Sequence, residues 1–146
     1  MAFDPSAIAP FTVFRCDYRF SGDPEPEPAR RFICLQHRSA GNQKLVISLK
    51  ATSKVEAYRN NPKRLQGVLL YEAGAIPCFE KATVVQTKLW PIDYFHLIKE
   101  ELRGNFLILG MMPSDFPEAL AKAVRSSVEL NRSEKARIFE LLGARE

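Results

Sequence analysis

The sequence predicts a mainly β fold with α-helices: a small, mostly antiparallel β-barrel followed by C-terminal helices, in a single domain over residues 1–146. Short segments rich in β-branched and aromatic residues follow one another through residues 11–110. Residues 114–146 change to the spacing of amphipathic helices. A length of 146 residues with 46% hydrophobic content is sufficient for one domain with a core.

The clearest strand lies near the N-terminus, where Phe14, Cys16, Tyr18 and Phe20 alternate with charged residues. This period of two indicates a strand with one buried face. Residues 21–29 cannot continue the strand, because their three prolines lack N–H donors and hold the chain extended. We therefore expect an exposed connection there.

Two further strands are predicted at residues 31–37 and 44–50, joined as a hairpin across 38–42. Ser53 is then placed to cap a short helical turn over residues 54–58. Additional short strands of β-branched or aromatic content are expected at residues 67–71, 78–79, 83–89 and 94–98. Residues 106–110 are apolar on both faces, which leaves a buried strand and the approach to a helix as alternatives.

Two helices are expected in the C-terminal part. Ser114 is the predicted cap of a helix over residues 115–129, in which apolar side chains share one face. A second helix is predicted to start after Ser133 and to end at Gly143, because glycine is the preferred residue just beyond a helix end.

Composition limits the classes of function. The three cysteines are odd in number and widely spaced, which argues against a disulfide framework or a zinc knuckle and favours buried thiols at Cys16 and Cys34. No apolar run approaches the roughly 20 residues of a membrane span, and the N-terminus lacks the form of a secretion signal. We expect a soluble, cytoplasmic protein that needs no metal.

The net charge of +4 fits an anionic partner without identifying one. Basic residues are concentrated in residues 30–64, which are the best candidate for an electropositive face. The candidate nucleic-acid contacts in this stretch are Arg38, Lys44, Lys50 and Lys54.

A plausible phosphate site lies at the ends of two predicted strands. Arg30 and Arg31 open one of them, and Thr52 and Ser53 follow the other. Neighbouring strands could bring these groups to one edge of a sheet, where guanidinium and hydroxyl donors suit phosphate oxygens.

The order of these elements, with the segments 31–35 (Arg-Phe-Ile-Cys-Leu) and 51–53 (Ala-Thr-Ser), resembles the PemK/MazF-like toxins. The resemblance implies an SH3-like barrel and metal-independent cleavage of single-stranded RNA without a cofactor. It implies that Arg31 stabilises or protonates the reacting phosphate and that Thr52 stabilises it as well, while the RNA 2′-hydroxyl attacks and leaves a 2′,3′-cyclic phosphate. It also implies two protein partners, an acidic antitoxin and a second copy of the chain in a homodimer.

Several alternatives stay open at this point. Arg30 is the active cation if the strand register differs by one residue. Thr52 and Ser53 could serve only as helix caps, and His37 is either a catalytic base or a surface residue. Trp90, Tyr94 and Phe95 could stack on bases, but they more often fill a core or an interface.

Two rival functions come from a different class. One is a non-catalytic SH3-like module that uses residues 30–64 to bind nucleic acid or an acidic peptide. The other is a degenerate toxin-fold protein that retains only protein interactions. Both rival functions predict binding, whereas only the toxin hypothesis predicts RNA cleavage.

Overall fold

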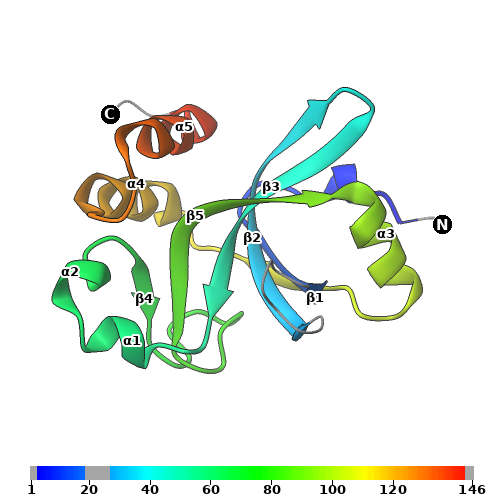
Figure 1. Ribbon diagram of the computed structural model, residues 1–146. Coiled ribbons are helices and arrows are strands. Elements are labelled where there is room, and N and C mark those ends of the chain that lie inside the picture. Colours follow the sequence, from blue (N-terminus) through cyan, green and yellow to red (C-terminus); the bar gives the residue numbers. More distant parts are fainter. Residues whose placement is uncertain (1–2, 19–26, 144–146) are drawn as a thin grey trace.

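The computed structural model describes residues 3–18 and 27–143 and shows a mixed α/β fold built on a single six-stranded antiparallel sheet (Figure 1). The strand order is β4-β5-β3-β2-β1-β6. The strands are β1 (Thr12–Tyr18), β2 (Glu27–Ala40), β3 (Gln43–Thr52), β4 (Leu69–Tyr71), β5 (Thr83–Asp93) and β6 (Leu107–Met111). The helices are the 3₁₀ turn η1 (Pro5–Ala7), α1 (Glu56–Arg59), α2 (Pro62–Leu65), α3 (Tyr94–Leu102), α4 (Phe116–Ser126) and α5 (Arg132–Leu142).

The predicted closed barrel is wrong. Among the strands that the structure describes, β4 and β6 are the two edges and do not pair with each other. Both edge strands are short, which suits an open sheet because short edges offer few unpaired backbone groups. The sheet still bends, since its ladders contain irregularities in β1, β2 and β3.

The N-terminal strands agree with the predicted alternation. β1 buries Phe14 and Cys16 and exposes Arg15, and β2 and β3 form the expected antiparallel hairpin. The hairpin turn is shorter than predicted, with Gly41 at φ 62° supplying the left-handed conformation that a two-residue turn requires. The expected proline-bearing connection lies partly outside the described residues, and its last part, 27–29, belongs to β2.

Three predicted elements differ in type or position. The strand expected at 94–98 is helix α3, because the Asp93 side chain caps it by accepting from the Phe95 N–H at 2.8 Å. Residues 78–79 form a turn instead of a strand. The predicted helical turn begins later, at Glu56, with Val55 rather than Ser53 at the cap position. Residues 107–111 form strand β6, but it is an edge strand with exposed side chains, so neither the expected buried strand nor a helix approach is found there.

Both C-terminal helices are present, with corrected boundaries. α4 follows Asp115 rather than Ser114, and it ends at Ser126 because Ser127 adopts an extended conformation. α5 starts two residues earlier than predicted: it follows Asn131 rather than Ser133, and the Asn131 side chain forms a capping box with Glu134. Gly143 ends this helix in the left-handed conformation, as predicted.

Apolar side chains cover both faces of the sheet. On one face, the helices α4 and α5 pack against strand residues; the members that form this core include Val13, Ile33, Leu49, Val85, Leu120 and Ile138. On the other face, α3 contributes to a second core with members that include Phe14, Phe32, Val46, Ile92 and Leu97. Figure 1 accordingly shows α3 at the opposite end of the molecule from α4 and α5. None of the helices in the described ranges is long and apolar enough to cross a membrane.

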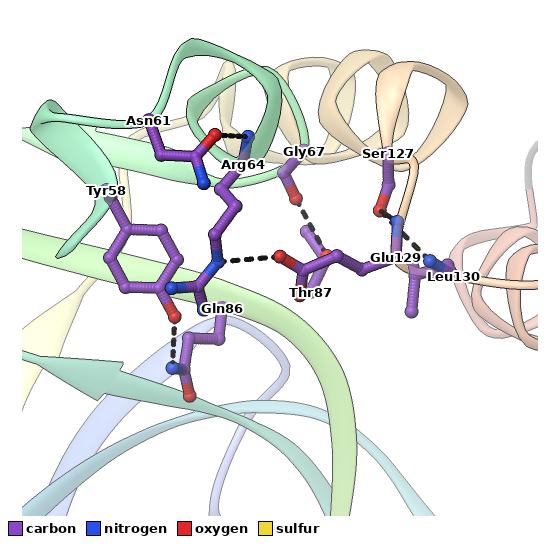
Figure 2. A network of polar contacts seen from close by, with 9 residues as sticks. All are labelled: Tyr58, Asn61, Arg64, Gly67, Gln86, Thr87, Ser127, Glu129 and Leu130. Atoms are coloured by element: carbon purple, nitrogen blue, oxygen red, sulfur yellow. Dashed lines mark hydrogen bonds and ion pairs between the residues drawn. The ribbon is translucent and has the colours of Figure 1, made fainter.

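A polar network joins α2, β5 and the connection between α4 and α5 (Figure 2). The Arg64 Nε donates to a Glu129 carboxylate oxygen at 2.7 Å, and the Thr87 hydroxyl donates to the Gly67 carbonyl at 2.8 Å. The Ser127 hydroxyl accepts from the N–H groups of Glu129 and Leu130, each at 3.2 Å. These contacts fix the path of the chain between the two C-terminal helices.

Candidate functional site: a cationic hollow beside β1 and β2

Arg15 and Arg31 stand directly opposite each other on β1 and β2, and both line a hollow of about 440 Å³. The loop between β4 and β5 forms another part of its wall. The hollow is lined by Arg15, Arg31, Ser53, Pro77, Cys78, Glu80, Lys81 and Leu109, and we call it the cationic hollow.

Arg31 is held by its surroundings. Its guanidinium carbon lies 5.4 Å from the centroid of the fully buried Phe79 ring, a cation–π contact. Phe79 is itself fixed by the loop, because its N–H donates to the Ile76 carbonyl at 2.9 Å and its carbonyl accepts from the Gly74 N–H at 3.1 Å. Burial lowers the pKa of Arg31 from its ordinary value of 12.5, yet a guanidinium in a protein keeps its charge.

The charges in the hollow favour an anion. Arg15, Arg31 and Lys81 supply three cations, whereas Glu80 supplies one carboxylate. Within the described ranges, none of the three cations has a carboxylate partner at ion-pair distance. Ser53 is exposed at the same opening and adds a hydroxyl donor. Converging cations and a hydroxyl are the groups that bind phosphate oxygens.

Of the two adjacent arginines, Arg31 faces the hollow and Arg30 does not. Arg31 lines it, whereas Arg30 pairs with Cys16 and its Nε donates to the Tyr18 carbonyl at 3.1 Å. Successive side chains in a strand point to opposite faces. The register therefore directs Arg31 into the hollow and Arg30 away from it.

Thr52, the other residue of the predicted catalytic pair, is not among the residues that line the hollow. Arg31 is opposite Ala51, so the next residue, Thr52, belongs to the other face of the sheet. Its hydroxyl accepts from the Lys54 N–H at 3.2 Å, which is a local turn contact. Ser53, one residue on, is the hydroxyl that the structure brings to Arg31.

His37 lies far from the hollow. It is six residues further along β2 than Arg31, which corresponds to about 20 Å in an extended strand. One ring nitrogen, Nε2, contacts the Ile8 carbonyl at 2.6 Å, and the other, Nδ1, contacts the Tyr94 hydroxyl at 2.5 Å. His37 thus links the N-terminal segment to the start of α3.

The predicted RNA contacts are spread along the sheet. Arg38 pairs with Glu140 of α5 at 3.3 Å, and Lys44 is exposed near the tip of the hairpin. Lys50 lines a different pocket, beside Trp90, whereas Lys54 is exposed and follows Ser53 directly. Of these four residues, Lys54 is the nearest in sequence to the cationic hollow.

Two of the three candidate stacking aromatics are partly buried. Trp90 and Tyr94 pack against the second core, as predicted for the commoner role of such residues. Phe95 differs, since its side chain is 77% exposed on the first turn of α3.

Sequence reasoning missed Arg15, Glu80 and Lys81. The exposed position of Arg15 follows from the alternation in β1, but its place opposite Arg31 depends on the pairing register. Glu80 and Lys81 lie in an irregular loop, whose path no periodic pattern predicts. Cys78 also lines the hollow, where burial raises the pKa of its thiol and so disfavours the nucleophilic thiolate.

No protein-family model, curated protein or solved structure matches this chain.

Proposed function

We propose that this chain binds single-stranded RNA at the cationic hollow and cleaves it without a metal ion. In the proposed reaction the RNA 2′-hydroxyl attacks the adjacent phosphate and leaves a 2′,3′-cyclic phosphate, as the PemK/MazF-like toxins do. The observation that carries the proposal is the convergence of three cations, a hydroxyl and a carboxylate on one opening of about 440 Å³. An open sheet is sufficient for this, because the reaction requires the site and not a closed barrel.

The groups in the hollow match the needs of that reaction. Attack by the 2′-hydroxyl requires a proton acceptor, and the Glu80 carboxylate is the lining group suited to that role. Charge that develops on the nonbridging phosphate oxygens would be stabilised by Arg15 and Arg31. Lys81 can return a proton to the departing 5′-oxygen. Arginine itself is a poor base, so Arg31 is assigned electrostatic stabilisation.

A second candidate function is a non-catalytic binding module, or a degenerate toxin-fold interaction protein, that holds nucleic acid or an acidic peptide. The position of Thr52 favours it, because the hydroxyl that the toxin family would use is on the other face of the sheet. In this alternative the cations of the hollow hold an anionic chain and no bond is broken.

The proposal includes two protein partners. An acidic antitoxin segment would compete with RNA for the cationic hollow. A homodimer is compatible with edge strand β6, which exposes Leu107, Ile108 and Met111 and leaves one side of its backbone open to pairing. Sedimentation velocity would show whether the chain is dimeric, and a monomer at all concentrations would remove this part of the proposal.

RNA cleavage in the presence of EDTA tests the enzymatic proposal. We expect the wild type to cut a long single-stranded RNA and to leave cyclic phosphate ends, and Arg31→Ala and Glu80→Gln to lose about 100-fold or more in rate. Arg38→Ala is the matched control, since it removes the same charge from the other end of β2. Thermal unfolding of each variant checks its fold.

The outcomes separate the two candidates. No cleavage by the wild type, or equal cleavage by Arg31→Ala, would reject the enzyme. RNA binding that Arg31→Ala weakens, without any cleavage by the wild type, would establish the binding module instead.

A further inference from the structure

A second cavity lies away from the cationic hollow, between the β2–β3 hairpin, β5 and α5. Its volume is about 530 Å³, within the range of small-molecule sites. Apart from Ala40, six apolar side chains line it: Leu45, Ile47, Leu89, Pro91, Leu130 and Ile138. We call this space the hairpin cavity.

The walls of the hairpin cavity are fixed by local structure. On one side, β3 and β5 pair directly, with Ile47 opposite Pro91. On the other side, the capping box between Asn131 and Glu134 sets the start of α5, which presents Ile138. The Ser127 hydroxyl holds the backbone at Leu130. Such a cavity is largely formed before a ligand arrives, which lowers the entropic cost of binding.

Several of the lining groups are left incompletely covered by the protein. Leu45, Leu89 and Leu130 are all partly exposed, although they surround a concave space where apolar area can be buried. Burial of that area by a ligand is favourable by roughly 25 cal/mol per Å². The floor of the cavity therefore suits an apolar group.

The rim has a different chemistry. Arg38, Lys88 and Arg137 are its cations, and Glu134 and Glu140 are its carboxylates. Both carboxylates are engaged: Glu140 pairs with Arg38 at 3.3 Å, and Glu134 accepts from the Asn131 N–H at 3.0 Å. Across the residues that the structure places, Arg137 has no carboxylate at ion-pair distance.

We propose that the hairpin cavity binds a small amphipathic carboxylate, with its apolar body against the six lining side chains and its carboxylate at Arg137. The apolar floor excludes a wholly polar ligand such as free phosphate. The excess of cations on the rim excludes an apolar amine. The size of the cavity suits a single small molecule.

Octanoate, octan-1-ol and octylamine are suitable probes, because they share a chain and differ in the head group. Binding can be followed by calorimetry, with a second signal from the fluorescence of Trp90, the single tryptophan, whose neighbours in the sequence, Leu89 and Pro91, line the cavity. We expect octanoate to bind saturably with one molecule per chain and octan-1-ol to bind about tenfold more weakly. Octylamine should show no saturable binding.

Two variants test the assigned contacts. Arg137→Gln should weaken octanoate binding by about tenfold and remove its advantage over octan-1-ol. Arg132→Gln is the matched control, since it removes the same charge from the same helix at a position that does not line the cavity. Leu45→Phe should weaken the binding of both octanoate and octan-1-ol, because the larger side chain fills the cavity. Urea unfolding checks that this variant is folded.

The proposal is overturned if octanoate does not bind saturably, if Arg137→Gln and Arg132→Gln bind it equally, or if Leu45→Phe leaves its affinity unchanged in a folded protein. Failure of all three probes would also overturn it, and a segment of another protein would then be the better occupant for the apolar floor.

Discussion

Arg15 lies directly opposite Arg31 across the β1–β2 ladder, and both side chains line the cationic hollow. Opposed like charges destabilise an antiparallel pair. Glu80, the carboxylate among the described lining residues, balances only one of the hollow's three cations. This electrostatic cost in the free protein would be removed by a bound anion.

Arg15→Gln should therefore make the free protein more stable. We expect its free energy of unfolding to rise by a few tenths of a kcal/mol at low salt, because the substitution removes the repulsion with Arg31. The gain should shrink near 1 M salt, where screening acts over about 3 Å. Urea unfolding at both salt concentrations measures the effect.

Arg38→Gln is the control for this prediction, since it removes an arginine that pairs with Glu140. It should give no increase in stability. If Arg15→Gln lowered the free energy of unfolding at low salt, repulsion between the opposed arginines would not be the dominant interaction there.

The salt dependence of RNA binding should distinguish the cationic hollow from the wider basic face. For single-stranded RNA, each phosphate that the protein neutralises contributes about 0.7 to the slope of log affinity against log salt. Arg31→Gln and Lys81→Gln should each reduce the magnitude of this slope by about that amount. Fluorescence anisotropy with a labelled single strand, from low to moderate salt, gives the slopes.

Lys44→Gln is the matched control for RNA binding, because Lys44 is exposed near the hairpin tip and does not line the hollow. It should leave the slope unchanged. An equal reduction in Lys44→Gln would mean that RNA follows the length of residues 30–64 instead of binding in the hollow.

Much of the sheet could be predicted because burial on one face imposes a period of two on the sequence. The alternation of Phe14 and Cys16 with charged residues identified β1, and the hairpin predicted across 38–42 contains the observed turn at Gly41. Residues 94–98 were misassigned because their aromatic residues favour strands by propensity, whereas the Asp93 cap favours a helix. Closure of the barrel could not be inferred, since it depends on long-range pairing of the edge strands.

The candidate site was predictable only in part, because it too depends on contacts between segments that are distant in the sequence. The pair Arg30 and Arg31 could be selected because it opens a predicted apolar strand, and the family resemblance pointed to Arg31. Its neighbours Arg15 and Lys81 come from a separate strand and from an irregular loop, so their approach depends on register and loop path. A shift of one residue also decides whether Thr52 or Ser53 shares the face of Arg31.

Gly67 should be intolerant of a side chain. A Cβ at this position would lie 2.8 Å from the Ser127 Cα, closer than atoms in folded proteins approach. Gly67→Ala must then displace the connection between α4 and α5, at a cost of about 1–3 kcal/mol. The neighbouring Gln66→Ala is the control, because Gln66 is exposed. Equal urea midpoints for the two variants would show that the chain accommodates the extra methyl group.

Stability should fall at alkaline pH because of two buried thiols. Burial raises the pKa of Cys16 and that of Cys34 to about 12, from an ordinary value of 9.0. The unfolded chain therefore releases these protons at a lower pH than the folded protein does. The contribution of the two thiols to the free energy of unfolding is fully present below pH 9. It is lost as the pH rises from there toward 12.

Between these limits each thiol should lower the free energy of unfolding by about 1.4 kcal/mol per pH unit. Urea unfolding at several pH values above 9, with a reductant present, measures the slope. Cys16→Ala should be less stable at every pH because it leaves a cavity. Its free energy of unfolding should fall less steeply with pH, because one of the two buried thiols is gone. Cys78→Ala should change the slope less, since this thiol is only partly buried. Identical slopes for the wild type and Cys16→Ala would show that the thiol of Cys16 ionises alike in the folded and unfolded chains.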